Sequence, residues 1–165
     1  MHTFRCLALA IFMLAPVAVL AEPSAIYLVR HAEKGTAGKD PDLTAAGQSR
    51  AQVIATILQH TGIAHIFSSP YARTRQTAQP LAERAGLTTQ TYDPSAPQAL
   101  VDKVKALSGA VLVVGHSNTL PELVRLFGGS PGRDIADHEY DRVYLLVPGT
   151  GGAIRTILLT SPPAS

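Results

Sequence analysis

Short apolar runs alternate along the chain with longer segments in which apolar residues recur at helical spacing. The runs are bounded by charged or turn-forming residues, which is typical of buried strands. They predict strands over residues 25–29, 65–68, 89–92, 110–114, 142–147 and 153–159. The helical spacing predicts helices over residues 44–60, 69–84, 97–107 and 119–127.

Strands that alternate with helices predict βαβ units. We therefore expect an α/β fold with a mostly parallel β-sheet covered by helices on both faces. The run Ala110–Val114 is apolar at every position, as in a central strand buried on both faces. The turn-rich link Pro148–Gly152 predicts a hairpin between the last two strands. No internal repeat or domain linker is visible.

Two of the predicted helices begin with capping signals. Ser69 followed by Pro70 combines a preferred N-cap residue with a proline that suits the first helical position. Thr119 and Glu122 have the spacing of a capping box. That spacing accounts for Glu122 without a catalytic role.

The first 21 residues differ from the rest of the chain. A positively charged start over Met1–Arg5 is followed by an apolar run over Cys6–Leu20 and by small residues before Glu22. This pattern predicts a secretory signal over residues 1–21, followed by a single domain over residues 22–165. The apolar run is shorter than the roughly 20 residues of a membrane-spanning helix, and an uncleaved anchor is the alternative. The expected location is periplasmic or secreted, with no stable membrane insertion after cleavage.

Charge and cysteine content exclude some classes of function. The chain has 14 Lys and Arg against 12 Asp and Glu, with no basic run, so a nucleic-acid partner is not expected. Its one cysteine, Cys6, lies in the predicted signal. The mature chain is therefore expected to have neither disulfides nor a cysteine-ligated metal. The oligomeric state cannot be deduced from these numbers.

Polar side chains suited to phosphate chemistry follow several predicted strands at their carboxyl ends, where ligands bind in open α/β sheets. Arginine side chains match phosphate oxygens bidentately, and a neutral imidazole is a competent nucleophile towards phosphorus. Phosphoryl transfer needs mainly positioning and charge stabilisation, so a rim of cations around one nucleophile would suffice. The side chains are Arg30, His31, Arg73, Asp93, His116 and Asn118.

Other residues of the same types have simpler roles. Arg73 and Arg75 are separated by about 200° around a helix, so at most one of them faces the pocket. His60, His65 and His138 lack such neighbours and are expected to be structural or solvated.

Four sequence elements resemble, in order, motifs of the histidine phosphatase superfamily, the phosphoglycerate mutase-like proteins. The segment from Leu28 to Glu33 is similar to the Arg-His-Gly-Glu signature, with Ala32 in place of the glycine. Residues 43–47 match a Leu-Thr-x-x-Gly element. Residues 68–78 resemble Ser-Pro-x-x-Arg-x-x-Gln-Thr-Ala, and residues 113–117 resemble the strand of the second histidine.

The resemblance implies a phosphoglycerate mutase-like fold and a phosphoryl-accepting His31. Arg30, Arg73 and His116 would hold the phosphoryl oxygens, and we also expect Asn118 to contact the substrate. No metal or organic cofactor is implied. The chain looks like the small phosphatases of the family, which lack the long insertions over the site that a mutase would need.

The family's proton donor has no clear match. Asp93 is the candidate acid and Glu33 the second, while the alternative for Asp93 is a turn-forming role before Pro94. The expected function is hydrolysis of a small phosphomonoester or phosphoramidate through a phosphohistidine. Two alternatives stay open: a metal-dependent hydrolase that uses His31, His116 and Asp93 as ligands, and a non-catalytic phosphate-binding or envelope interaction protein.

Overall fold

The computed structural model describes residues 22–163. The predicted signal over residues 1–21 lies outside the described residues.

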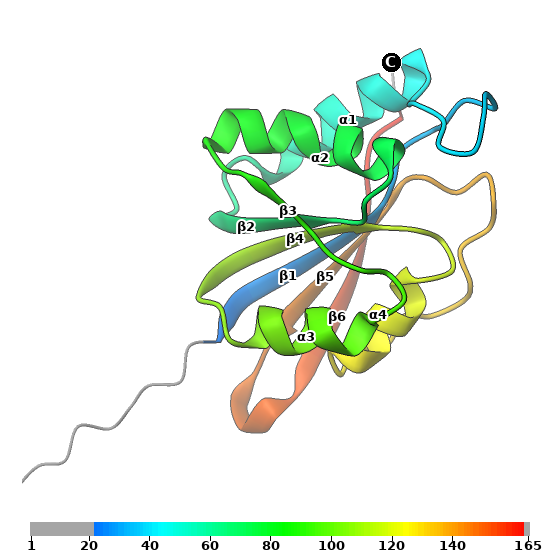
Figure 1. Ribbon diagram of the computed structural model, residues 1–165. Coiled ribbons are helices and arrows are strands. Elements are labelled where there is room, and N and C mark those ends of the chain that lie inside the picture. Colours follow the sequence, from blue (N-terminus) through cyan, green and yellow to red (C-terminus); the bar gives the residue numbers. More distant parts are fainter. Residues whose placement is uncertain (1–21, 164–165) are drawn as a thin grey trace, which may run out of the picture.

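Strands and helices alternate as expected over most of the chain (Figure 1). The predicted elements are all present, with bounds that differ from the predictions by a few residues. The elements are β1 (Pro23–Arg30), α1 (Ala45–Leu58), β2 (Ile63–Ser68), α2 (Ala72–Ala85), β3 (Thr89–Thr91), α3 (Pro97–Lys105), β4 (Gly109–Gly115), α4 (Leu120–Leu126), β5 (Arg142–Pro148), the 3-10 turn η1 (Thr150–Gly152) and β6 (Ile154–Thr160).

The six strands form one sheet in the order β3-β2-β4-β1-β5-β6. The strands β1 to β4 run parallel to one another, and β5 and β6 form the predicted antiparallel hairpin at one side. In the register, Arg30 lies opposite Gly115, and Ser68 lies opposite Val114. The carboxyl ends of β1, β2 and β4 therefore reach the same edge of the sheet.

Helices cover both faces of the sheet, as predicted (Figure 1). The helices α1 and α2 pack together on one face, and α3 and α4 pack together on the other. Apolar residues of β1 and β4 alternate between the two faces, so both strands are buried on both sides. The helices bury Ile54, Ala55, Leu58, Ala78, Leu81 and Ala82 on one face, and Leu100, Val101, Val104, Leu120, Leu123 and Val124 on the other.

The predicted cap at Ser69 is wrong, and Thr119 takes the predicted N-cap position of α4 without the side-chain bond of a cap. The helix α2 begins at Ala72, and Ser69 lies before it in extended backbone. Its first amide is capped by the Asp40 carboxylate, whose two oxygens each lie 3.0 Å from the Ala72 nitrogen. At the start of α4, Thr119 makes no side-chain cap, because its hydroxyl bonds back to the backbone of His116. Both hydroxyls instead contact His116, which follows β4: Ser69 contacts its ring and Thr119 its backbone.

The start of α1 is fitted against the segment that follows β1. Thr44 caps the helix by accepting from the Gly47 amide at 3.1 Å, and its own amide donates to the Glu33 carbonyl. A Cβ at Gly47 would lie 2.1 Å from that carbonyl oxygen. This contact explains why glycine ends the Leu-Thr-x-x-Gly element.

Within residues 22–163, no helix has the length and apolar character that crossing a bilayer requires.

Candidate phosphate-binding site

Two histidine rings meet at the carboxyl edge of the sheet. The backbone amide of His31 donates to the Gly115 carbonyl at 2.9 Å, which ties the end of β1 to the end of β4. The rings of His31 and His116 consequently lie edge to face, with their centroids 5.4 Å apart. Both residues are buried, at 3% and 8% exposure. The structure thus brings together the two histidines that the sequence predicted.

The ring of His31 presents a free lone pair. Its Nδ1 atom lies 2.8 Å from the Ala32 carbonyl oxygen, which can only accept, so Nδ1 carries the proton in the neutral ring. The pKa of His31 is lowered to about 4, mainly by burial, with the nearby charge of Arg30 acting in the same direction and the carbonyl contact against it. At neutral pH the ring is therefore neutral, with its lone pair on Nε2.

The ring of His116 is held by a hydroxyl. Its Nε2 atom lies 2.9 Å from the Ser69 Oγ atom, and both side chains are buried. Burial lowers the pKa of His116 to about 4, and the charges of Arg73 and Arg30 act in the same direction. This ring is also neutral at neutral pH.

Two arginine side chains bring unused donors to this edge. The Nε atoms of Arg30 and Arg73 are buried and have no hydrogen-bond partner within the described part of the chain. Buried donors of this kind are rare unless a ligand or water satisfies them. Burial lowers the pKa of Arg30, but from so high a value that the group stays charged. Arg75 is exposed, so Arg73 is the arginine of this helix that faces inward.

Each arginine also stacks on a tyrosine. The Arg30 Cζ atom lies 4.2 Å from the ring centroid of Tyr140, and the Arg73 Cζ atom lies 4.4 Å from that of Tyr71. The tyrosine rings lie next to the histidines. The ring centroids of Tyr140 and His31 are 6.0 Å apart, and those of Tyr71 and His116 are 5.2 Å apart. Sequence reasoning missed both tyrosines, although Tyr71 stands inside the Ser-Pro-x-x-Arg motif.

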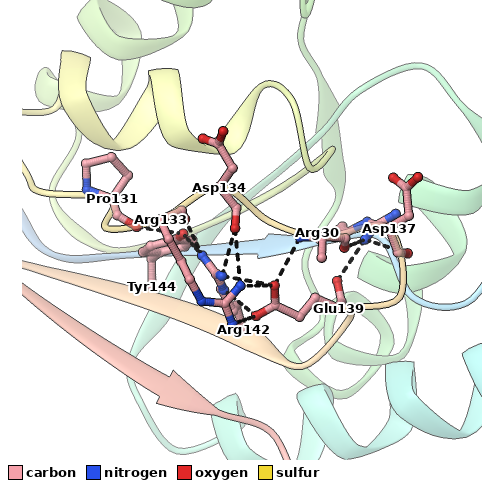
Figure 2. A network of polar contacts seen from close by, with 9 residues as sticks. Arg30, Pro131, Arg133, Asp134, Asp137, Glu139, Arg142 and Tyr144 are labelled. Carbon is pink, nitrogen blue, oxygen red and sulfur yellow. Dashed lines mark hydrogen bonds and ion pairs between the residues drawn. The ribbon is translucent and has the colours of Figure 1, made fainter.

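Arg30 is positioned by the loop that precedes β5 (Figure 2). Its Nη1 atom donates to the carbonyl oxygens of Ala136, Asp137 and Glu139 at 2.8–3.0 Å. These bonds anchor the loop to an arginine of the site.

A charged network holds the same loop in shape (Figure 2). The Glu139 carboxylate accepts hydrogen bonds from Arg142, Arg133 and the Ala136 amide. These bonds lower the pKa of Glu139 to about 2. Arg142 is buried and also donates to the carbonyls of Arg133 and Asp134. Sequence reasoning took Arg142 only as the start of a strand, because several of its partners are backbone carbonyl oxygens of an irregular loop, which carry no side-chain signature.

The first acid candidate, Asp93, is exposed and forms a turn. Its carboxylate accepts from the amide and the hydroxyl of Ser95, at 2.8 and 2.7 Å. These two bonds lower the pKa of Asp93, whereas a general acid needs a raised pKa. The geometry favours the turn-forming role, and the acid role stays a prediction.

The second acid candidate, Glu33, is committed to an ion pair. Its carboxylate lies 2.7 Å from the Arg50 Nη2 atom. Burial, the largest single cause, acts to raise the pKa of Glu33, but the hydrogen bonds it accepts and the charges of Arg50 and Arg30 together outweigh it, and the net pKa is lowered. A third carboxylate, Asp40, which sequence reasoning missed, lies 3.4 Å from Arg73.

Asn118, the remaining predicted substrate contact, is exposed on the turn between β4 and α4. Among residues 22–163, no three His, Cys, Asp or Glu side chains are arranged to hold a metal ion. The metal-dependent alternative needs His31, His116 and Asp93 to form such a group, and they do not.

Comparison with known sequences identifies the first half of the domain. Residues 26–94 match the model of the histidine phosphatase superfamily, branch 1. The protein named Probable phosphoglycerate mutase GpmB of Escherichia coli O1:K1 is 43% identical over 68 residues, which cover 37% of this chain and 32% of the relative. The match thus spans about a third of the length of the curated relatives.

Solved structures share the fold over most of the chain. A protein histidine phosphatase SixA complexed with tungstate is 20% identical, with 84% of this chain and 97% of that chain covered and a TM-score of 0.63. A mycobacterial glucosyl-3-phosphoglycerate phosphatase is 16% identical, with 86% and 99% covered and a TM-score of 0.60. At these identities the likeness concerns the fold alone. The family model over residues 26–94, the order of the motifs and the phosphoglycerate mutase-like fold agree, and all three indicate the histidine phosphatase superfamily.

Proposed function

We propose that the protein is a phosphatase that uses His31 as its nucleophile. The observation that carries the proposal is the neutral His31 ring, with its lone pair on Nε2, at the edge of the sheet where the buried Nε–H groups of Arg30 and Arg73 have no partner among residues 22–163. The match of residues 26–94 to the histidine phosphatase superfamily supports the same conclusion.

The reaction has two displacements at phosphorus. The lone pair of His31 Nε2 forms the N–P bond while the bond from phosphorus to the leaving atom breaks, and the leaving atom takes its electron pair and then a proton. Water then attacks the phosphohistidine, the N–P electron pair returns to Nε2, and the water gives up a proton as inorganic phosphate forms. Arg30, Arg73 and His116 hold the phosphoryl oxygens in both steps, where preorganised donors lower the barrier.

The substrate class we propose is a phosphoramidate, such as a phosphohistidine side chain, or a phosphomonoester with a good leaving group. Three nearby carboxylates already have partners: Glu33 pairs with Arg50, Glu139 with Arg142, and Asp40 with Arg73. A site whose nearby carboxylates are already paired suits a leaving group that needs no proton from the enzyme: a stable aryloxide anion, or an imidazole ring that solvent has already protonated. One solved neighbour is named a protein histidine phosphatase, which supports this choice.

We also propose that the protein is exported to the periplasm or secreted. The charged start, apolar run and small residues within residues 1–21 support a cleaved signal. Mass spectrometry of the protein recovered from outside the cytoplasm tests this. A chain that begins at Glu22 supports the proposal, and a chain that keeps residues 1–21 contradicts it.

The test of the activity is capture of the phosphoenzyme. Rapid mixing with p-nitrophenyl phosphate should give a burst of nitrophenol and an acid-labile phosphoryl group on His31. His31→Ala should abolish both while the circular dichroism spectrum is unchanged. His65→Ala, a half-buried histidine of β2 away from the site, is the matched control and should keep both.

The alternative, a phosphate-binding protein without turnover, gives a different result in the same experiment. It predicts saturable binding of tungstate or inorganic phosphate with no burst and no phosphoenzyme. That result would replace the phosphatase proposal.

A further inference from the structure

A chain of three buried polar side chains ends on the second histidine. His116 Nε2 lies 2.9 Å from Ser69 Oγ, which in turn lies 2.9 Å from Thr74 Oγ1. Ser69 and Thr74 are both 0% exposed, so water does not compete for these contacts. The Ser-Pro-x-x-Arg motif includes Ser69 but assigns no role to its hydroxyl or to that of Thr74. Ser69 is also not the helix cap that the sequence predicted.

The direction of the hydrogen bonds follows from the far end of this chain. Thr74 Oγ1 lies 2.8 Å from the Tyr71 carbonyl oxygen and 3.0 Å from the Ser69 carbonyl oxygen. Carbonyl oxygens only accept, so the single hydroxyl proton of Thr74 points to one of them. Thr74 Oγ1 is then left as an acceptor.

The next two steps are fixed by counting protons. Because Thr74 can only accept from Ser69, the single hydroxyl proton of Ser69 is donated to Thr74. The Ser69 Oγ atom consequently faces His116 with a lone pair, and the contact is a hydrogen bond only if His116 Nε2 carries the proton. In the neutral ring the lone pair then lies on Nδ1.

We propose that Ser69, oriented by Thr74, is a positioning residue that fixes His116 in the tautomer with a proton on Nε2 and a lone pair on Nδ1. The inference rests on the proposed function for its purpose. When a protonated phosphate group binds, Nδ1 of His116 takes up its proton. The protonated Nδ1 then donates a hydrogen bond to a phosphoryl oxygen. The two histidines thus hold opposite tautomers, with the proton on Nδ1 in His31 and on Nε2 in His116.

The direct test is nitrogen NMR of protein labelled with ¹⁵N in the histidine rings, with His116→Asn to assign the signals. At neutral pH, His116 Nε2 should show the shift of a protonated ring nitrogen and Nδ1 that of an unprotonated one. The measurement needs no substrate and reads the wild-type protein, so it stays decisive even if a variant fails to fold. A His116 ring with its proton on Nδ1 would overturn the proposal.

Variants of the two hydroxyl residues sharpen the test. Thr74→Val removes the acceptor, so the Ser69 hydroxyl can donate to His116 and the tautomer should reverse. Thr74→Ser keeps the hydroxyl and should restore the wild-type pattern. Ser68→Ala is the matched control, because Ser68 is equally buried and its hydroxyl bonds only to the Ser69 carbonyl. An unchanged tautomer in folded Thr74→Val would contradict the proposal.

Binding of inorganic phosphate links the tautomer to the site. Saturating phosphate should protonate Nδ1 of His116 in the wild type. In Ser69→Ala the Kd for inorganic phosphate should rise about tenfold, the loss of one well-oriented charge-assisted hydrogen bond. An unchanged Kd would contradict the positioning role. A protein that shows this tautomer and binds phosphate but makes no phosphoenzyme would sink the phosphatase proposal and leave this inference standing.

Discussion

The ring centroids of His31 and His116 lie 5.4 Å apart, edge to face, within the electrostatic influence of Arg30 and Arg73. Burial, and then the arginine charges, hold the pKa of each ring near 4. Protonating either ring would place a third positive charge beside two guanidinium groups. The free site therefore holds two neutral rings, and an anionic ligand restores the charge balance.

The depressed pKa values predict acid sensitivity. The unfolded chain binds a proton at each ring near pH 6.5, whereas the folded protein does so only near pH 4. The stability that these rings contribute is therefore fully present above about pH 6.5 and is lost as pH falls towards about 4. Urea unfolding between pH 7 and pH 5 should show a decrease of at most about 1.4 kcal/mol per pH unit for each ring. His31→Asn with His116→Asn should flatten the decrease, and an equally steep decrease in that double variant would contradict the assignment.

Arg73 should matter far more than its neighbour on the same helix. Its buried, unpartnered Nε–H group is placed to hold a phosphoryl oxygen. Arg73→Ala should lower kcat/KM for p-nitrophenyl phosphate on the order of 10²- to 10³-fold, as for the loss of one oxyanion donor. Arg75→Ala is the matched control and should stay within about threefold of the wild type. Similar losses in both variants would show that helix charge, rather than Arg73 itself, supports activity.

Much of this site could be read from the sequence because its parts follow directly from local signals. Arg30 and His31 end a buried strand, and His116 ends the most apolar one, so strand order alone brings them to one edge. Helical geometry allowed only one of Arg73 and Arg75 to face the site, and the resemblance to the Ser-Pro-x-x-Arg motif indicated Arg73.

The parts that could not be predicted depend on distant segments. The carbonyl oxygens that hold Arg30 come from residues more than 100 positions away and carry no side-chain signature. The capping patterns predicted the wrong hydrogen bonds for the hydroxyls of Ser69 and Thr119. A hydroxyl can bond to a helix end or to a neighbouring residue, here the ring and the backbone of His116. Only the folded backbone decides between those partners.

Asp93 is the residue for which sequence and structure point in different directions. Its exposed carboxylate is bound to Ser95, and its pKa is lowered by those bonds. We expect Asp93→Asn to change turnover of good and poor leaving groups by the same small factor. The measurement is kcat for a series of aryl phosphates with leaving groups of increasing pKa. A loss that grows with leaving-group pKa would restore Asp93 as the general acid.

Gly47 should resist replacement by alanine. In an ordinary helix this change stabilises by about 1 kcal/mol. Here the new Cβ would lie 2.1 Å from the Glu33 carbonyl oxygen, so α1 or the segment after His31 has to move. We expect Gly47→Ala to lower the free energy of unfolding by about 1–3 kcal/mol, as overpacking does. Chemical denaturation measures it, with the exposed Ala46→Gly as control for helix propensity, and a more stable Gly47→Ala would contradict the close fit.

Glu139 should influence phosphate binding without touching phosphate. Through its bonds to Arg142 and Arg133, Glu139 holds the loop whose carbonyl oxygens position Arg30. Glu139→Ala should therefore raise the Ki of inorganic phosphate about tenfold, since a hydrogen bond from a charged group is worth roughly 1.5–3 kcal/mol. Asp134→Ala, an exposed residue of the same loop that contributes only its carbonyl, should leave Ki within about twofold. An unchanged Ki in folded Glu139→Ala would show that the loop does not set the position of Arg30.

The place of β1 in the sheet has a consequence for how the protein is made. This first strand of the described chain lies between β4 and β5. These two neighbours begin at Gly109 and Arg142, so they are synthesised long after β1. Pairings this distant in sequence form late, because loop closure precedes any gain from the contacts. A growing or prematurely terminated chain would carry His31, the proposed nucleophile, without the two strands that pair with β1. Phosphatase activity should then begin only after β5 has left the ribosome.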